Sequence, residues 1–466
     1  MIEAGANPRV VVIGGGISGL AAAHRLSTAG LSVALIEKSA ELGGKVITEH
    51  IDGFVIEGGP DSFVAGKGTV IELATELGIA DRIISSRPEH QDSYVWSRGR
   101  FHRLPAGLLL MAPARLGPLF GSSLLSWRGK LRAAADLLIP RGQPEGDESL
   151  ESFVVRRLGR EVLDRIAEPL IAGIHAAEPA SMSLEASFPR FLEMERDHRS
   201  LILAARALSK RAGTTIKSHF ASFRGGMGDL TAALIGSLQG ADQRMGVAVN
   251  RIRMRSAIGF LLDLTDGTQL EAEAIVLATP AEDSAALLGE VAPRASEAIA
   301  GIRQVATTAV TLAYRSEQIP VVRGSGFVVP ALEGRRLMGV SYLSQKWQAR
   351  VPSEQFVLLR AFLRRGLSDQ QPTEVAQAEL ADLVGIRTQP ILEKTHHWAS
   401  GLHQYTLGHR QRVARAEGHL RAIPGLALAG AAFHGIGLNE CIASGRRAAD
   451  LVAATIKGGA RTVTLY

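Results

Sequence analysis

Three glycines near the N-terminus have the spacing of a turn that binds a dinucleotide. Gly14, Gly16 and Gly19 follow the apolar run 10–13 and fit the pattern G-x-G-x-x-G. The first glycine of this pattern permits a tight turn, the second lets the backbone approach a pyrophosphate, and the third lets a helix pack closely on a strand. The free N–H groups of that helix then face the phosphates. Because glycine-rich turns also occur without nucleotides, the motif needs support from other residues.

An acidic residue stands where a dinucleotide site needs one. The run 32–37 is typical of a second buried strand, and it ends in Glu37, 18 residues after Gly19. A carboxylate at this point can bind the hydroxyl groups of the ribose. A solvated acid at the end of a strand is the alternative interpretation.

Further glycines favour a flavin over a nicotinamide. The stretch 41–45 contains Gly43 and Gly44, and the stretch 57–62 contains Gly58 and Gly59. A domain that binds only a nicotinamide dinucleotide does not need this second group of glycines, whereas flavoproteins that bind a long, extended dinucleotide often carry it there. We therefore expect a flavin dinucleotide.

The C-terminal region repeats the order of strand, glycines and helix. The run 425–430 predicts a short buried strand, and 435–445 leads into a helix that continues to about residue 454. A helix N-terminus beside the flavin pyrimidine would stabilise the negative charge of the reduced flavin, and Gly437 would let backbone amides approach the ring. The alternative, a glycine-rich connector that closes a final core helix, leaves the return to this order unexplained.

The elements around these motifs predict an α/β protein of several parts. A hairpin is expected over 93–105, mainly helices over 106–211 including one long helix over 188–208, and mostly antiparallel strands over 246–278 and 307–363. The predicted fold class is α/β, with a Rossmann-like FAD-binding domain, a mixed-sheet substrate domain and a helical insertion. The expected divisions are 1–88, 222–290 and 394–466 for the FAD-binding domain, 89–109, 201–221 and 291–393 for the substrate domain, and 110–200 for the helical domain.

Two apolar stretches in the helical part allow two interpretations. The stretches 108–111 and 116–125 would form an exposed apolar patch for a membrane or an apolar substrate, or they would be the buried faces of helices. Buried faces are the more common outcome.

The composition excludes several classes of protein. The 466 residues have 46% apolar and 21% charged side chains, which is typical of a folded globular protein of two or three domains. The net charge is +6, but the 52 Lys and Arg residues are scattered, so no nucleic-acid arm is expected. The excess positive charge fits an anionic substrate, an anionic membrane surface or simple solubility.

The cellular setting predicted from the sequence is the cytoplasm. The single cysteine, Cys441, excludes an intramolecular disulfide and a multi-cysteine metal site. Residues 1–9 lack the basic and apolar regions of a secretory signal. The long uncharged span 422–439 is interrupted by Pro424 and glycines, so it does not predict a membrane helix. We expect a soluble protein that contacts a membrane at most peripherally, on the inner face of the cell membrane.

Four strings of residues identify a family. The strings 166–174, 187–202, 403–409 and 435–441 resemble the FAD-dependent porphyrinogen oxidases of the amine oxidase superfamily, and the resemblance covers nearly the whole chain. It implies the cofactor FAD and a six-electron oxidation of a porphyrinogen to a porphyrin in haem biosynthesis, with molecular oxygen as the acceptor. A homodimer and a peripheral membrane contact are both compatible with it, and no metal is implied.

The resemblance also carries functional residues onto this chain. The only catalytic group that it suggests is the backbone carbonyl of Gly173, as a proton acceptor. The residues that it implies for FAD contact are Gly14, Gly15, Gly16, Ile17, Ser18, Gly19, Ile36, Glu37, Gly44, Gly59, Pro60, Asp61, Ser62, the backbone of Val249, Trp398, Ile436, Gly437 and Leu438.

The chain departs from the family pattern at two places. His175 stands where the family commonly has another aromatic residue, and it either binds a carboxylate of the substrate or packs as an aromatic ring. Ser93 stands where protoporphyrinogen oxidases usually have an arginine for a propionate, whereas coproporphyrinogen oxidases tend to have a small polar residue there. Ser93 therefore slightly favours coproporphyrinogen III, whose four propionates need cations elsewhere. The candidates are Lys67, Arg364 and Arg365.

Two other functions compete with this prediction. An amine oxidase or carotenoid desaturase would share both glycine motifs but not the central strings. A flavin-fold escort protein without redox chemistry would keep the glycines, although the intact surroundings of Trp398 and Gly437 argue against it.

Overall fold

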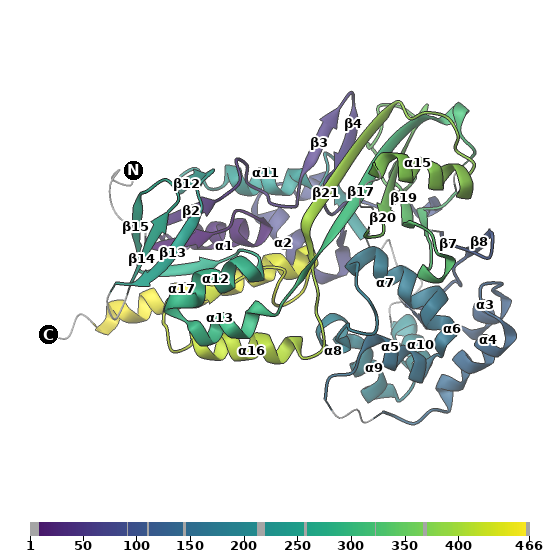
Figure 1. Ribbon diagram of the computed structural model, residues 1–466, viewed down its shortest axis with the longest axis horizontal. Coiled ribbons are helices and arrows are strands. Elements are labelled where there is room, and N and C mark those ends of the chain that lie inside the picture. The colour runs from purple at the N-terminus through teal and green to yellow at the C-terminus, as the bar shows by residue number, and fades with distance from the viewer. Residues whose placement is uncertain are drawn as a thin grey trace.

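The protein is described by a computed structural model that covers residues 9–90, 92–109, 111–142, 146–211, 220–255, 259–321, 323–366 and 371–462. A parallel sheet with helices on both faces, a long mixed sheet and a group of helices occupy three regions of the molecule (Figure 1). The α/β fold class is thereby confirmed. The domain boundaries given above remain a prediction.

The first region is a five-stranded parallel sheet built from distant parts of the chain. Its strand order is β12 (Asp242–Met245), β2 (Val33–Glu37), β1 (Val10–Ile13), β16 (Ala274–Leu277) and β22 (Leu426–Leu428). All four residues of β1 are buried, because helices cover both faces of the sheet. This arrangement is the predicted Rossmann-like sheet.

Alternate residues of the strands feed two cores. Val10, Val12 and Leu35 pack beneath the helices α1 (Ile17–Thr28), α2 (Thr69–Glu76), α11 (Gly228–Gly236) and α17 (Leu438–Thr462). On the other face, Val11 and Ile13 pack beneath α12 (Ala281–Val291), α13 (Pro293–Ala300), α16 (His409–Leu420) and the small antiparallel sheet of β13 (Val249–Met254), β14 (Phe260–Leu264) and β15 (Gln269–Ala272). The period of two along each strand produces this division.

The second region is a seven-stranded mixed sheet. Its order is β21 (Leu392–His403), β17 (Gln304–Arg315), β20 (Phe356–Leu363), β19 (Leu337–Tyr342), β18 (Gly326–Val328), β7 (Ser93–Ser97) and β8 (Arg100–Arg103). Only the pair β18–β7 is parallel. Helix α15 (Pro372–Leu383) packs on the sheet, and the long strands β17 and β21 extend from it toward the parallel sheet (Figure 1). The hairpin predicted over 93–105 is therefore correct.

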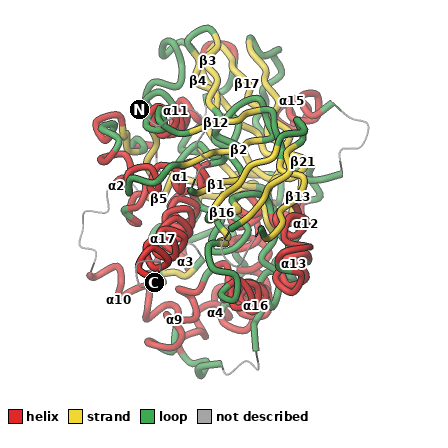
Figure 2. Tube along the Cα trace, turned by 90° about the vertical axis from the view of Figure 1, so that its left-hand side faces the viewer, coloured by secondary structure: helices red, strands yellow, loops and turns green. Residues whose placement is uncertain are grey.

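The third region consists of helices around a core of their own. Figure 2 shows them at the opposite end of the molecule from β3, β4 and β17. The elements are α3 (Leu116–Gly121), α4 (Trp127–Ala134), α5 (Leu150–Arg157), α6 (Arg160–Val162), the π-helical turn η5 (Leu163–Ala167), α7 (Glu168–His175), α8 (Leu184–Ser187), α9 (Pro189–His198) and α10 (Leu201–Arg211).

The apolar stretches of this region are mostly buried. Met111, Leu119, Leu124 and Leu125 belong to the helical core, and Leu108 packs partly buried against it. For the described residues of 108–111 and 116–125 the alternative of an exposed patch is therefore wrong, and Leu110 lies outside the described residues. The exposed apolar side chains lie just beyond these stretches, at Trp127, Leu131 and Leu138.

The single long helix predicted over 188–208 is also wrong, because the chain breaks between α9 and α10. Arg199 has a φ of 64° and ends α9. Ser200 is buried, accepts a hydrogen bond from the Leu203 amide at 3.2 Å and donates one to Asp136 at 2.5 Å. Ser200 thus caps a new helix, and a residue far away in the sequence determines the break.

Shorter strands connect the three regions. They are β3 (Thr48–Ile51), β4 (Phe54–Glu57), β5 (Phe63–Val64), β6 (Ile83–Ser85), β9 (Leu108–Leu109), β10 (Ala112–Pro113) and β11 (Phe220–Phe223). Among the helices that the structure describes, none combines the length and the apolar character that crossing a bilayer requires.

Candidate active site

The glycine turn after β1 is shaped for close packing on one side and is open on the other. A Cβ on Gly19 would stand 1.8 Å from the carbonyl oxygen of Gly14, and a Cβ on Gly14, whose φ is +103°, would stand 2.7 Å from that of Ala278. A Cβ on Gly16, in contrast, would meet nothing within 4 Å. Gly16 precedes α1 and offers no side-chain cap, so the first-turn amides of the helix are left for another acceptor, as a pyrophosphate site requires.

The carboxylate of Glu37 is held against this turn. Its two oxygens accept hydrogen bonds from the amides of Gly15, at 2.6 Å, and Ser39, at 2.8 Å. The amide of Val247 donates to the Glu37 carbonyl at 3.1 Å, which brings the start of β13, at Val249, close to the end of β2. Both groups lie at the carboxyl end of a parallel strand, where α/β sheets bind nucleotides.

The second glycine segment is packed onto the first. The amide of Gly43 donates to the Gly15 carbonyl at 2.8 Å, and a Cβ on Gly59 would stand only 1.7 Å from the carbonyl oxygen of Lys45. The mixed sheet holds this segment from the other side: Trp398 Nε1 donates to the Gly58 carbonyl at 2.8 Å, and Arg360 Nη1 donates to that of Gly59 at 2.6 Å. The predicted flavin residues therefore come together from both sheets.

Asp61 connects the same segment to the mixed sheet by charge. Lys346 Nζ lies 2.9 Å from Asp61 Oδ2, Trp347 Nε1 donates to the same oxygen at 3.3 Å, and Ser62 Oγ donates to Oδ1 at 2.9 Å. Burial alone would raise the pKa of Asp61, but the ammonium group of Lys346 and the charge of Arg360 outweigh it and hold that pKa well below its usual range. Asp61 is thus a permanently charged anchor.

The C-terminal helix closes against the first glycine turn. A Cβ on Gly445 would stand 2.1 Å from the Ser18 carbonyl oxygen, so α17 crosses α1 at close range. Because α1 and α17 follow β1 and β22 of one parallel sheet, their N-termini lie at the same carboxyl edge. The segment Ile436–Leu438 therefore reaches the edge that carries Gly14–Gly19.

The string 403–409 forms a clasp, and we use this name for these seven residues. Tyr405 Oη donates to the Ala431 carbonyl at 2.8 Å and accepts from the Gly435 amide at 2.6 Å, and the ring of His409 stacks on that of Tyr405 at 3.9 Å. Gln404 Nε2 donates to the His175 carbonyl at 3.1 Å. Neighbouring residues of the clasp thus hold the glycine loop before α17 and the last turn of α7.

His403, the first residue of the clasp, offers an unpaired nitrogen. Its Nε2 is buried and has no hydrogen-bond partner among the described residues. Burial, with the positive charge of Lys45, lowers the pKa of His403 to about 3, so the ring is neutral. An orphaned polar atom here, the open side of Gly16 and the free amides of α1 all fit a bound dinucleotide.

These buried histidines predict an acid-sensitive fold. Burial lowers the pKa of His175 to about 4, of His403 to about 3 and of His409 to about 4, from an ordinary value of 6.5. The unfolded chain therefore binds more protons than the folded chain below about pH 6.5, and stability falls as the pH decreases toward 4. The melting temperature, measured between pH 7 and pH 4, is expected to decrease steadily. His175→Phe should reduce the number of protons taken up on unfolding by about one, and therefore weaken the dependence of stability on pH. An unchanged pH dependence would contradict this assignment.

A cavity of about 510 Å³ lies between α7 and the mixed sheet. Ser93, at the start of β7, and Gly173, in the last turn of α7, both line it. The last carbonyls of a helix have no partner within the helix, so the Gly173 carbonyl is suited to accept a proton or a hydrogen bond. The other residues that line this cavity are Ser86, Arg87, His90, Tyr94, Leu104, Leu170, Phe220, Ser325, Gly326, Phe327, Val328, Met338, Gly339, Val340, Ser341, Lys346 and Phe362.

Two of the three cations predicted from the sequence, Arg364 and Arg365, are paired away from the cavity lining. Arg364 donates to the Val329 carbonyl at 2.6 Å and lies 3.5 Å from Glu168, and Arg365 pairs with Glu178 at 3.8 Å. His175 is buried with its ring edge-on to Phe188 at 5.2 Å, which matches the packing alternative. None of these three is among the described residues that line the cavity. The side chain of Lys67 lies outside the described part of the chain.

The cavity instead contains basic residues that the sequence analysis did not single out. Arg87, His90 and Lys346 line it, in segments where no motif drew attention to them. In the sequence, only the position of Arg87 and His90 just before the hairpin at Ser93 could have indicated that they line the cavity.

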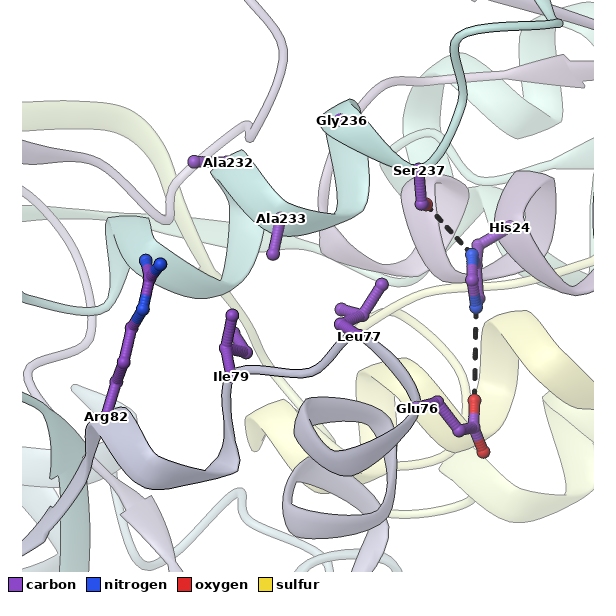
Figure 3. Close-up of a pocket in the computed structure, with 9 residues that line it drawn as sticks. All are labelled: His24, Glu76, Leu77, Ile79, Arg82, Ala232, Ala233, Gly236 and Ser237. Carbon is purple, nitrogen blue, oxygen red and sulfur yellow. Dashed lines mark hydrogen bonds and ion pairs between the residues drawn. The ribbon is translucent and has the colours of Figure 1, made fainter.

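A second cavity, of about 540 Å³, lies between α1, α2 and α11 (Figure 3). His24 Nδ1 is 2.9 Å from Ser237 Oγ, and His24 Nε2 is 3.9 Å from Glu76 Oε2. The Ser237 hydroxyl donates to the Leu234 carbonyl at 2.6 Å, so it accepts from the His24 ring. His24 is paired with Ser237 and Glu76 with Arg446, and none of the predicted site residues lines this cavity.

Comparison with known proteins agrees with this geometry. The family model of the flavin containing amine oxidoreductases matches residues 17–453. A coproporphyrinogen III oxidase of Propionibacterium freudenreichii is 35% identical over 95% of this chain and 90% of its own length, and the human protoporphyrinogen oxidase is 32% identical over 96% and 98%. A crystal structure from Exiguobacterium, provisionally named a protoporphyrinogen oxidase, superimposes with a TM-score of 0.85 and 28% identity over 97% of this chain and 99% of that one.

The match to the family model begins at Ile17, the first residue of α1, and extends through the mixed sheet and most of α17. The chain belongs to the family of flavin containing amine oxidoreductases, its relatives include porphyrinogen oxidases, and it is an FAD-dependent oxidoreductase.

Proposed function

We propose that this enzyme oxidises a porphyrinogen to a porphyrin in haem biosynthesis, with molecular oxygen as the final acceptor. The observation that carries the proposal is the cavity, which is lined by apolar and hydroxyl side chains and by the basic residues Arg87, His90 and Lys346, with no Asp or Glu among its described lining residues. Such a lining suits a large, flat macrocycle whose edge carries carboxylates. The names of the relatives support this substrate class.

The chain's own part in this reaction is mainly positioning. Bound FAD supplies the two-electron oxidation, which is repeated three times for one porphyrinogen. The apolar side chains of Leu170 and Phe362 line the cavity and exclude water, while the Gly173 carbonyl is available to accept a proton from the ring system. Lys346 lines the cavity and also binds Asp61, which ties the substrate cavity to the flavin segment 59–62.

The cofactor contacts that we propose are those named from the sequence, from Gly14–Gly19 and Glu37 to Ile436–Leu438. The convergence of these residues from the carboxyl edge of the parallel sheet and from the mixed sheet supports the proposal. Removing the Glu37 carboxylate would also release the Gly15 amide that it binds.

The basic test follows the flavin and the product together. The purified protein is expected to show a flavin absorption spectrum and to produce porphyrin fluorescence from a porphyrinogen while consuming oxygen. A protein that cannot bind FAD would contradict every redox proposal. Flavin reduction by amines, without any reaction with porphyrinogens, would instead favour the amine oxidase or desaturase alternative.

We further propose coproporphyrinogen III as the preferred substrate, with protoporphyrinogen IX as the alternative. The support comes from Ser93, which lines the cavity with its hydroxyl 3.1 Å from that of Ser325. Ser93→Arg would place a new cation in the cavity, and we expect it to shift relative kcat/KM about tenfold toward protoporphyrinogen IX, which corresponds to one charge-assisted contact. Steady-state assays with both substrates measure this ratio. An unchanged ratio would remove Ser93 from the specificity of the enzyme.

A peripheral membrane contact is also proposed for this otherwise cytoplasmic protein. Trp127, Leu131 and Leu138 are 67%, 62% and 81% exposed, and Arg128 is exposed beside them. Apolar side chains next to a cation favour an anionic lipid surface. Flotation with anionic vesicles, compared between the natural protein and Trp127→Ser, tests this contact.

We also propose that the enzyme forms a homodimer. Light scattering on the same purified sample measures the oligomeric state.

A further inference from the structure

The guanidinium group of Arg87, which lines the substrate cavity, has no partner among the described residues. Its Nε is buried and makes no hydrogen bond to any described residue, and no described carboxylate lies within ion-pair distance of it. A partly buried arginine is usually paired, because desolvating its charge is unfavourable. The missing partner is therefore expected to be a ligand.

The backbone fixes where this guanidinium stands. Arg87 lies between β6 (Ile83–Ser85) and the 3-10 turn Pro88–His90, and its amide donates to the Lys346 carbonyl at 3.0 Å. The charge of Lys346 is already balanced by Asp61 at 2.9 Å. Of these two neighbouring cations on the cavity wall, Arg87 is thus the one whose charge is not compensated.

The chemistry of the group selects its ligand. A guanidinium presents a planar fork of donors that matches the two oxygens of a carboxylate, and it stays charged at any physiological pH. The cavity around it adds the hydroxyls of Ser93 and Ser325 and no described acidic side chain, so an anion meets no repulsion there. We propose that Arg87 binds a carboxylate of the substrate.

This inference rests on the proposed function, since it assigns a residue to the substrate of that same cavity. It adds a cation that lines the cavity, whereas Arg364 and Arg365, chosen from the sequence, do not line it. A ligand without the carboxylate would gain nothing from Arg87, so the residue favours macrocycles that carry carboxylates over uncharged ones.

The test compares binding of an acid and its ester. Coproporphyrin III and its tetramethyl ester are titrated into the FAD-loaded enzyme, and binding is followed by the porphyrin absorption band. Arg87→Met is expected to weaken binding of coproporphyrin III by roughly 10- to 100-fold and to leave binding of the ester unchanged. With coproporphyrinogen III, the same variant is expected to raise KM by a similar factor while kcat is retained.

Two further variants make the result specific. Arg87→Lys keeps the charge but not the fork, so it should lose less affinity than Arg87→Met. Arg100→Met removes an exposed arginine of β8 outside the cavity and should change nothing. If Arg87→Met does not fold, the loss in Arg87→Lys for the acid but not for the ester carries the same conclusion.

The outcomes separate this inference from the proposed function. Equal losses for the acid and the ester, or no loss for either, would overturn the assignment of Arg87 while the natural enzyme still oxidises porphyrinogens. An enzyme that binds FAD but neither binds porphyrins nor oxidises porphyrinogens would overturn the proposed function itself.

Discussion

Replacing Gly16 with alanine is expected to remove FAD from the protein while the apoprotein stays folded. A Cβ on Gly16 would contact no protein atom within 4 Å, and the φ of −70° and ψ of 176° at this position suit any residue. The methyl group would instead occupy the space in front of the α1 amides, where we place the pyrophosphate. A loss of FAD affinity of at least about 100-fold is expected, because the phosphates could no longer approach the backbone.

The neighbouring Gly19 provides the matched comparison. Its Cβ would stand 1.8 Å from the Gly14 carbonyl, so Gly19→Ala should destabilise the fold by about 3 kcal/mol or more, with or without cofactor. Flavin content after gel filtration and the melting temperature of the apoprotein separate the two variants. Gly16→Ala protein that retains its FAD, or that unfolds as readily as Gly19→Ala, would contradict this description of the turn.

Removing the carboxylate of Asp136 is expected to unfold the helical region. Arg157 is fully buried and donates to Asp136 through its Nε at 2.6 Å, and the Ile202 amide donates to Oδ2 of the same carboxylate at 3.1 Å. Asp136→Ala leaves the charge of Arg157 without its closest partner and removes the anchor of Ser200 at the start of α10. The free energy of unfolding should fall by about 3–5 kcal/mol, as for other broken buried ion pairs.

Chemical denaturation followed by circular dichroism measures this loss. Asp197→Ala is the control, because its ion pair with Arg196 is exposed and is expected to contribute little. Because α7 carries Gly173, the Asp136 variant should also lose porphyrinogen oxidation before it loses flavin. A variant as stable as the control would show that Arg157 is satisfied by Glu195 and by the backbone carbonyls of residues 136, 139 and 140.

The sequence predicted the cofactor side of the molecule better than the substrate side, for a physical reason. Glycines such as Gly14 and Gly19 are required by backbone geometry within a few residues, so their spacing reveals their role. Arg364 and Arg365 looked like free cations, but their partners Glu168 and Glu178 come from a helical region almost two hundred residues earlier in the chain. Spacing along the sequence cannot reveal such pairs.

The helices and strands show the same difference between local and long-range determinants. The run 10–13 and the hairpin from Ser93 were predicted correctly, since local pattern alone determines them. The break at Arg199 was missed, because it depends on the contact between Ser200 and Asp136. The clasp was noticed as a string with family resemblance, but its contacts to Gly435 and to the end of α7 could be found only in three dimensions.

The order of strands in the parallel sheet determines when the cofactor site can form during synthesis. β1 and β2 leave the ribosome first, but their neighbours β12 and β16 follow only after more than two hundred residues, and β22 and α17 come last. The outer edges of β1 and β2 therefore stay unpaired while the mixed sheet and the helices are synthesised. Pairing between strands so distant in sequence is slow. FAD capture is therefore expected to follow the synthesis of α17, and the earlier strands are expected to need protection from aggregation until α17 docks on α1.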